Sequence, residues 1–599
     1  MSQKDLLTGR RTKTTAMKRL IRTMLITVLC VMMVACGEDT KLEYGEEWSI
    51  TTSGSTSATI TTDDIEFDYT PLDEDETIPD DDDDYVENAT FESKIEISYS
   101  GSTATVTGSV SGVEVTVSGA HVTVNATVSG VEYILSGTSD DGSFKIYSEK
   151  KMKITLDGLT LNNPTGAAIN DQCGKSMFLV LTEDSENSLS DGSSYTTTDS
   201  EDMKGTIFSE GQIIISGEGT LDITANCKNG ISSDDYIILR PGNVININAN
   251  ASNGIKANDY VIVRGGVLNI DVATAGSKGI SSDGHVTVEG GRTTVITSGG
   301  VEIEDNDTKS CAGIKADSTL NITAGTLKVQ STGQGGKGIS SDEDINISGG
   351  EITIVTTGAG YVKGSLDSYP KGIKADGNVN ISGGTINVNT SGGDGAEGIE
   401  SKATMTISGG DVTAYAYDDA LNASTRITLS GGTIYAYSST NDGIDSNGGL
   451  YISGGTIYAF GGTTPEGPFD CDNSTFAITG GTLFGIGGTT STPSTSATTQ
   501  PVILLGTKSY SSGAYVALSD ASGNELIGAT VPRTYSSAVL LVSSPDMTVG
   551  SSYTFTSDGS TLQTVSQSST IVSSGSSSGG IGGVGTNSNV GGRFGGGWW

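Results

Sequence analysis

The sequence predicts an all-β protein that folds as a right-handed, single-stranded parallel β-helix, and two repeated patterns carry this prediction. A Gly-Ile step recurs about every 25 residues, and a Gly-Gly step follows most of these steps before the next strand-like stretch. The Gly-Ile steps begin at Gly254, Gly279, Gly313, Gly338, Gly372, Gly398 and Gly443. A repeat of this kind indicates a solenoid in which each repeat forms one coil.

Within each repeat, apolar and polar residues alternate as in a strand with one buried face. In the stretch 383–389, for example, Ile386 and Val388 alternate with Asn387 and Asn389. Short strands separated by Gly turns stack in parallel at about 4.8 Å, and crossovers between parallel strands are right-handed. We therefore expect about twelve coils, with an N-terminal β cap and a small C-terminal β region covering the two open ends.

The N-terminus has the pattern of an export signal. Lys18 and Arg19 precede an apolar run at 24–34 that is too short to span a bilayer. The run ends at Val34-Ala35-Cys36, which resembles a bacterial lipoprotein cleavage box. We expect residues 1–36 to be a lipoprotein signal peptide and Cys36 to carry the lipid. The protein would then be an outer-membrane lipoprotein exposed at the cell surface, and an ordinary signal peptide is the alternative.

Composition divides the rest of the chain into four segments. Residues 37–93 contain runs of Asp and Glu, which predict an acidic disordered tether. Residues 94–488 form the β-helix, and residues 489–567 form a C-terminal β cap or domain. Residues 568–599 are rich in Gly and Ser, which predicts a flexible tail.

The net charge, the small number of His residues and the spacing of the cysteines argue against several functions. A formal net charge of −38 argues against nucleic acid as a partner, because both molecules would be polyanions. With 2 His in the chain, zinc and catalytic-triad chemistry are disfavoured. The four cysteines after Cys36 have no metal-ligand spacing and are expected to be small buried residues with no specified disulfide. They are Cys173, Cys227, Cys311 and Cys471.

A column of aspartates predicts calcium binding. Stacked coils would align Asp283, Asp317, Asp342 and Asp376, and such a row of like charges requires neutralisation. Calcium suits an oxygen-only site in an exported protein. The alternative is that each Asp caps the following tight turn. An insertion offers a second set of candidate calcium ligands, which are Glu302, Glu304, Asp305 and Asp307.

A row of lysines lies beside these aspartates. Lys256, Lys315 and Lys374 alternate with serines in successive coils, while Lys278, Lys337 and Lys371 precede the glycines of the other coils. Such a row could follow an anionic polymer such as a polyuronate. The alternative is that each Lys neutralises the Asp of its own or a neighbouring coil.

Aromatic residues replace polar ones at outward positions of the last coils. They are Tyr415, Tyr435, Tyr437, Tyr458 and Phe460. Exposed aromatic rings in register would offer platforms on which pyranose rings stack. The alternative is that the C-terminal β region packs on them.

The repeats also resemble a known family. Residues 143–151, 204–211 and 230–241, followed by the Gly-Ile-Lys-Ala-Asp and Gly-Ile-Ser-Ser-Asp coils, are similar to the carbohydrate-binding parallel β-helix family of exported clostridial and Bacteroides proteins. The resemblance implies a shape like that of pectate lyases, bound calcium, and affinity for cellulose-like and acidic galacturonan glycans. It assigns no individual ligand residues.

These observations favour a monomeric, surface-anchored, non-catalytic binding protein for cell-wall polysaccharides, with membrane contact only through the lipid. The first alternative is a calcium-dependent, pectate-type lyase in which Lys337 or Lys371 abstracts the C5 proton of a uronate. The second alternative is an adhesin or structural surface protein without a specific sugar.

Overall fold

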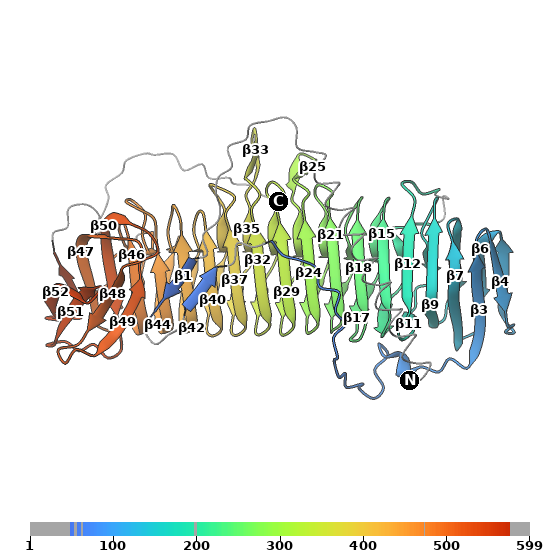
Figure 1. Ribbon diagram of the computed structural model, residues 1–599, viewed down its shortest axis with the longest axis horizontal. Helices are drawn as coiled ribbons and strands as arrows, with labels where there is room; N and C mark the ends of the chain where they lie inside the picture. The colour runs from blue at the N-terminus through green and yellow to red at the C-terminus, as the bar shows by residue number, and fades with distance from the viewer. Residues whose placement is uncertain (1–47, 53–56, 61–63, 197–200, 473, 576–599) are drawn as a thin grey trace, which may run out of the picture. The chain divides into compact units, whose positions relative to one another are not determined.

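The computed structural model describes residues 48–52, 57–60, 64–196, 201–472 and 474–575 (Figure 1). Within these residues, one three-residue 3-10 helix, η1 (Val86–Asn88), accompanies a chain that is otherwise strand, turn and loop. Among the described residues, no helix has the length and apolarity needed to cross a bilayer. The predicted signal peptide and Cys36 lie outside the described residues.

One sheet, which we call the site sheet, contains 15 strands and contributes one strand per coil. After the antiparallel β5–β6 pair, its neighbours are parallel, as predicted, and the stack has about 14 turns rather than twelve. Its strands are β5 (Val113–Ser118), β6 (Ala120–Ala126), β8 (Gly142–Ser148), β10 (Ile169–Gln172), β13 (Gly205–Ser209), β16 (Asn229–Ser233), β19 (Ile255–Ala257), β22 (Lys278–Ser282), β27 (Ala312–Ala316), β30 (Lys337–Ser341), β35 (Lys371–Ala375), β38 (Glu397–Ser401), β41 (Leu421–Ala423), β43 (Ile444–Ser446) and β45 (Phe469–Asp470).

Two further columns of strands complete the coils. The first column contains β3 (Ser93–Ser100), β7 (Val131–Ser139), β9 (Met152–Asn163), β11 (Met177–Leu181), β14 (Ile213–Gly217), β17 (Tyr236–Leu239), β20 (Tyr260–Val263), β23 (His285–Val288), β28 (Leu320–Ile322), β31 (Ile345–Ile347), β36 (Val379–Ile381) and β39 (Thr404–Ile407). The second contains β12 (Glu186–Asp191), β15 (Thr220–Ala225), β18 (Val244–Ala249), β21 (Val267–Val272), β24 (Arg292–Thr297), β29 (Thr326–Ser331), β32 (Glu351–Thr356), β37 (Thr385–Thr390) and β40 (Asp411–Ala416). β9 runs through both columns, as do β42 (Arg426–Ser438), β44 (Gly449–Phe460) and β46 (Phe476–Gly487) in the last coils.

The Ile of each Gly-Ile step builds the core. Ile255 pairs in register with Ile280, which pairs with Ile314, and the side chains of all three are fully buried. The Gly-Gly steps form the corners between the two other columns, where Gly350 and Gly384 adopt positive φ angles of 87° and 88°. The repeat therefore encodes both the interior column and the turn that closes each coil.

Strands at the two ends close the stack. At the N-terminal end, β4 (Thr103–Thr107) pairs antiparallel with β3, and β5 pairs antiparallel with β6. At the C-terminal end, β50 (Tyr535–Ser543) pairs antiparallel with β46 and with β47 (Val502–Tyr510). A four-stranded sheet follows, formed by β48 (Tyr515–Ser519), β49 (Glu525–Thr530), β51 (Ser552–Ser557) and β52 (Ser560–Ser566).

Two predictions about the chain's flanking segments need correction. The predicted flexible tail begins too early, because β53 (Ile571–Ser574) pairs in parallel with β47, while residues 576–599 lie outside the described residues. The prediction of a disordered tether is also wrong for its second half, because residues 64–92 lie against the coils. We call these residues the strap.

The strap is held by its carboxylates. Glu76 and Glu87 each approach the Arg240 guanidinium to 2.8 Å, and the Arg240 side chain is only 4% exposed. Glu74 accepts hydrogen bonds from the amides of Gly266 and Gly291, which belong to neighbouring coils. An acidic run that cannot form its own core is thus ordered by cationic and amide groups of the β-helix.

The strap connects regions that are distant in sequence. Phe91 packs edge-on against Phe178, whereas Asp64 accepts a hydrogen bond from Gln330 at 2.7 Å. Before the strap, β1 (Trp48–Thr51) and β2 (Ser57–Ile60) form a hairpin beside β37, β40 and β49 (Figure 1). The chain from β1 to β3 therefore runs along many coils, opposite to the direction in which they are stacked.

Candidate functional site

Two columns of outward side chains cross the site sheet. The first column lies at the start of each strand, and register places Lys278, Ala312, Lys337, Lys371 and Glu397 in it, with Asp419 and Asp442 at the equivalent positions of the next two coils. The second column contains Lys256, Ser281, Lys315, Ser340, Lys374, Glu400, Asn422, Asp445 and Asp470. Both columns change from basic to acidic between β35 and β38. The sheet thus has a basic half and an acidic half.

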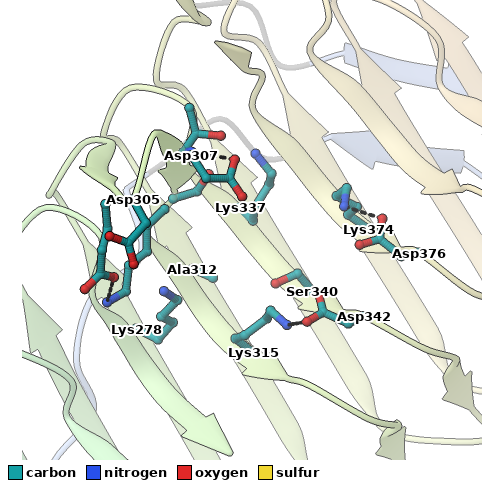
Figure 2. A pocket seen from close by; sticks show the side chains of 14 residues that line it. Lys278, Asp305, Asp307, Ala312, Lys315, Lys337, Ser340, Asp342, Lys374 and Asp376 are labelled. Carbon is teal, nitrogen blue, oxygen red and sulfur yellow. Dashed lines mark hydrogen bonds and ion pairs between the residues drawn. The ribbon is translucent and has the colours of Figure 1, made fainter. Parts of the chain in front are cut away.

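A groove of about 600 Å³ lies over the basic half, on β22, β27, β30 and β35 (Figure 2). Its floor carries Lys278, Lys315, Lys337 and Lys374, and the aspartates Asp342 and Asp376 lie just beyond the strand ends. One wall is a hairpin of β25 (Glu302–Glu304) and β26 (Asp307–Lys309), which projects from the stack (Figure 1). The groove therefore offers ammonium donors and carboxylate acceptors side by side.

The aspartates of the predicted calcium row form ion pairs with lysines. Lys315 Nζ lies 2.8 Å from Asp317 and 2.6 Å from Asp342, and Lys374 Nζ lies 2.5 Å from Asp376. Asp283 pairs in the same way with Lys256. The alternative interpretation, in which lysines neutralise the row, therefore describes Asp283, Asp317, Asp342 and Asp376, and their role as calcium ligands stays a prediction.

The residues of the insertion predicted as a second calcium site form a tight turn and ion pairs within a hairpin. Asp305 and Asn306 have φ angles of 49° and 66° and form the two-residue turn between β25 and β26. Lys309 Nζ lies 3.2 Å from Glu304 and 3.9 Å from Glu302. The Asp307 side chain accepts a hydrogen bond from the Thr308 amide at 2.7 Å. Turn geometry and hairpin ion pairs thus account for Glu302, Glu304, Asp305 and Asp307.

The lysines predicted to bind a glycan differ in availability. Lys337 is 8% exposed, and its ammonium donates to the carbonyls of Gly335 and Tyr369 and to the Ser368 hydroxyl at 2.6–2.9 Å. Burial, with the nearby Lys371 and Lys374, lowers the pKa of Lys337 to about 7. All three N–H groups of the Lys337 ammonium are nevertheless used in hydrogen bonds, so none is left to donate to a ligand.

Lys278, the first of the lysines that precede a Gly-Ile step, also lies in the groove. Its ammonium donates to the Gly276 carbonyl at 2.6 Å, and no carboxylate pairs with it among the described residues. Burial lowers its pKa to about 8, because desolvation disfavours the charged form. The sequence places Lys278 before a Gly-Ile step, and the register between neighbouring coils brings it close to Lys315.

The boundary between the two halves is a buried ion cluster. Lys371 Nζ lies 2.8 Å from Glu397 and 3.5 Å from Glu400, and Lys402 also pairs with Glu400. Although burial opposes its charge, Glu397 and Glu400 raise the pKa of Lys371 above its usual value. Lys371 is therefore neither a free ligand contact nor a proton acceptor, which corrects both predicted roles.

The acidic half contains a carboxylate cluster that the repeats did not indicate. Asp442, Asp445 and Asp470 each place an oxygen within 4.8 Å of the others. Burial is the main cause that raises the pKa of Asp442 to about 8 and that of Asp445 to about 7, and neighbouring carboxylates add to it. Asp419, one coil earlier, is 4% exposed, and its pKa is also raised by burial and by these neighbours. No lysine or arginine forms an ion pair with this cluster among the described residues.

The aromatic column is not an exposed platform. Tyr435, Tyr437, Tyr458 and Phe460 are at most 6% exposed and share a core with β47 and β50, and Tyr415 packs at its edge. Rings of successive coils stack on one another, with 5.1 Å between the centroids of Tyr435 and Tyr458. The C-terminal β region covers these rings, so their predicted role in sugar stacking is corrected in favour of the packing alternative.

The four cysteines of the β-helix are free thiols in the described residues. They are Cys173, Cys227, Cys311 and Cys471, and only Cys227 is not buried. Each lies in a different coil, as expected for small core residues.

Comparison with known proteins supplies a family. A family model described as "Carbohydrate-binding domain-containing protein" matches residues 118–276, 270–364 and 358–443. Among solved structures, the polysaccharide lyase-like protein from C. thermocellum, determined as a gadolinium derivative, is 22% identical. The match covers 51% of this chain and 99% of that chain with a TM-score of 0.33. No curated protein matches the chain.

Proposed function

Because the chain belongs to the carbohydrate-binding domain-containing family, we propose that it is a non-catalytic binding protein for acidic cell-wall polysaccharides. The groove on the basic half is the binding site in this proposal. A uronate carboxylate would pair with Lys278, while Lys315 and Lys374 contact neighbouring sugars along the stack. A monomer with a lipid on Cys36 would present this site at the outer surface of the cell.

The observation that carries the proposal is Lys278, a groove-lining ammonium without a carboxylate partner among the described residues. The other floor lysines are already neutralised or fully hydrogen bonded. An incoming carboxylate therefore gains a charge-assisted contact at Lys278 without breaking an existing ion pair. The mixed donors and acceptors of the groove would serve the sugar hydroxyls, which also suits a neutral cellulose-like chain.

Calorimetry with defined oligosaccharides tests the proposal. We expect oligogalacturonate to bind the wild type more tightly than cello-oligosaccharides of equal length. Replacing Lys278 and Lys315 together by Met keeps the aliphatic stems and should weaken oligogalacturonate binding by about 10- to 100-fold, because hydrogen bonds to charged groups are lost. Lys94→Met, in the N-terminal cap, is the control. Unchanged affinity in the Lys278/Lys315 variant would refute the groove as the site.

Calcium is the proposed cofactor, and the acidic half suits it better than the residues predicted from sequence. Asp442, Asp445 and Asp470 would supply the ligands, since oxygens about 2.4 Å from one ion can lie up to 4.8 Å apart. Asp442 is buried and the other two are half-buried, and clustered, partly buried carboxylates without a basic partner are costly unless they are protonated or bound to a cation. Glu397 lies one coil before Asp419, and its Oε1 pairs with Lys371. Its buried Oε2 has no hydrogen-bond partner among the described residues.

Titration with calcium in buffers of different ionisation enthalpy tests this site. We expect binding to release protons near pH 7, because the raised pKa values keep part of the cluster protonated before the ion binds. Asp445→Asn combined with Asp470→Asn should abolish both binding and the accompanying rise in melting temperature. Asp283→Asn is the matched control from the ion-paired row. Calcium affinity that survives in the double variant would exclude these ligands.

A polysaccharide lyase is the second candidate, and Lys278 is the observation that favours it. A pKa of about 8 leaves a useful fraction of neutral amine at mildly alkaline pH. The amine could remove the proton α to a uronate carboxylate beside Lys315. Formation of unsaturated uronate, followed by absorbance and lost in Lys278→Met, would establish this activity in place of simple binding. If the wild type bound no acidic or β-linked glycan, an adhesin would be the better assignment.

A further inference from the structure

Charges of opposite sign line the groove without pairing. On the floor, the Lys278 ammonium donates to a backbone carbonyl and has no carboxylate partner among the described residues. On the wall, Asp305 and Asp307 line the same groove, and no lysine or arginine pairs with either of them in the described part of the chain. The lysine of the hairpin, Lys309, pairs with Glu304 instead. Unpaired charges of both signs therefore border the space between floor and wall.

The register of hairpin β25–β26 shows which of its side chains share a face. Glu302 pairs with Lys309, and Glu304 pairs with Asp307. Paired residues, and residues two positions apart on one strand, project from the same face of a hairpin. These four side chains therefore share one face, and three of them line the groove. The wall thus presents the charged face of the hairpin to the groove.

The Asp307 carboxylate has an oxygen left for a ligand. Its Oδ1 accepts a hydrogen bond from the Thr308 amide at 2.7 Å, and its second oxygen accepts none from the described residues. In Figure 2, Asp305 and Asp307 lie on the hairpin side of the groove and Lys315 lies on the opposite side. An ionised carboxylate only accepts hydrogen bonds, so this wall recognises donors such as hydroxyl groups. Hydroxyl-to-carboxylate bonds are shorter and stronger than bonds between neutral groups.

The wall is fixed relative to the floor. Beside it lies a second hairpin, which consists of β33 (Tyr361–Lys363) and β34 (Leu366–Ser368). The Thr308 hydroxyl donates to the Asp367 carbonyl at 3.0 Å, and the hydroxyls of Ser310 and Ser368 lie 2.7 Å apart. The buried Lys337 ammonium donates to the Ser368 hydroxyl at 2.9 Å and so joins both hairpins to the site sheet. A wall held in this way needs no ordering when a ligand binds, which favours affinity.

We propose that one uronate unit of the glycan is held by two opposite edges, with its carboxylate on Lys278 and its ring hydroxyls on Asp305 and Asp307. A pyranose uronate carries its carboxylate at one edge and adjacent hydroxyls at the other, which matches a cationic floor and an anionic wall. Like charges keep the sugar carboxylate away from the wall, so one orientation of the ring is favoured. The inference rests on the proposed glycan-binding function and adds the residues that recognise free hydroxyls.

Calorimetry with chemically modified oligogalacturonates tests the two contacts separately. Asp305→Asn with Asp307→Asn removes both charges and keeps the turn, because Asn tolerates the positive φ of Asp305. This wall variant should bind unmodified oligogalacturonate about tenfold more weakly, since hydrogen bonds to charged groups are lost. O-acetylation of the ring hydroxyls should weaken wild-type binding to a similar degree and leave the affinity of the wall variant unchanged. Methyl esterification of the sugar carboxylates should weaken the binding of both proteins.

The control removes the same number of charges outside the groove. Asp367→Asn with Glu351→Gln replaces two exposed carboxylates that do not line the groove, and the affinity should not change. If the wall only repelled the acidic chain, the wall variant would bind more tightly than the wild type, and the inference would be overturned. Wild-type affinity in the wall variant would overturn it as well.

These outcomes are distinct from a failure of the proposed function. Lost binding in the Lys278/Lys315 variant, together with unchanged or tighter binding in the wall variant, overturns the wall and leaves the groove in place. Wild-type affinity in the Lys278/Lys315 variant overturns the groove itself. If the wild type binds no acidic glycan, both proposals fail.

Discussion

At the scale of single residues, Lys371 joins the basic and acidic halves of the site sheet. Its ammonium is buried at the point where both columns change sign, with Glu397 and Glu400 within 3.5 Å. Although burial favours their protonated forms, Lys371 and Lys402 hold the pKa of Glu400 below its usual value. One lysine thus stabilises two buried carboxylates that would otherwise repel each other.

Replacing Lys371 by Ala should lower the free energy of unfolding by about 3–5 kcal/mol, because breaking a buried ion pair leaves an uncompensated buried charge. Urea unfolding monitored by circular dichroism measures the change. Lys374→Ala removes a more exposed pair on the same strand and should cost less than about 1 kcal/mol. Equal losses in the two variants would show that Lys371 does not have this role.

At the scale of elements, the strap behaves as an additional layer of the β-helix. Arg240 lies 4.4 Å from the centre of the Tyr85 ring and pairs with Glu76 and Glu87, so three strap residues meet at one buried guanidinium. Arg292 pairs with Asp68 at 2.7 Å farther along the strap. These contacts use acidic residues whose composition alone predicts disorder.

Arg240→Ala should release the middle of the strap without unfolding the coils. Amides of residues 74–88 are expected to exchange hydrogen at least about tenfold faster, because their opening no longer breaks a buried, hydrogen-bonded charge pair. Mass spectrometry resolves this segment from the core strands. Lys151→Ala provides the control, since its partner Asp83 is 91% exposed. Uniform faster exchange throughout the coils would instead indicate that Arg240 supports the whole β-helix.

Elements differ in how far sequence could predict them. The Gly-Ile and Gly-Gly steps specify the coils, because the Ile of the first step builds the core and the glycines of the second step permit the turn. The same pattern cannot show what lies against an outward face. Tyr435 and Tyr458 alternate like exposed residues, yet β50 covers them. In the same way, Asp305 and Asn306 have the composition of a metal loop but serve as a tight turn.

At the scale of the whole molecule, charge is arranged by sign along the site sheet. Sequence predicted the lysine and aspartate rows, and the lysines do neutralise those aspartates. The acidic half was missed because Asp419 and Asp470 come from coils in which Ala420-Leu421 and Pro468-Phe469 replace the Gly-Ile step. Their carboxylates come together only when register is known. Part of the excess of acidic residues is thus gathered in one cluster, in which Asp442 is buried and Asp445 and Asp470 are half-buried.

This cluster makes stability depend on pH in a defined direction. Burial raises the pKa of Asp442 to about 8 and that of Asp445 to about 7, above the value of 3.8 for an unfolded Asp. Between these values the folded state holds protons that the unfolded state has released. The stabilising contribution is therefore complete below about pH 4 and is lost as pH rises through about 8.

In the presence of chelator, the melting temperature should fall between about pH 6 and pH 9, and Asp442→Asn with Asp445→Asn should flatten this slope. Saturating calcium should reverse the trend, because the ion binds the ionised carboxylates of the folded state. Differential scanning calorimetry at several pH values checks both expectations. A slope that is unchanged in the double variant would place the responsible groups elsewhere.

The course of the strap has a mechanical consequence. The hairpin β1–β2 lies beside β40 and β49, and residues 64–92 then run back along the stack before β3 begins. A pull on residue 48 parallel to the stacking direction loads the contacts of Arg292, Arg240 and Phe91 in shear, so that they resist together. A pull perpendicular to that direction would peel them one after another at much lower force. A protein tethered through its N-terminus would therefore hold a load best when drawn along its own stack of coils.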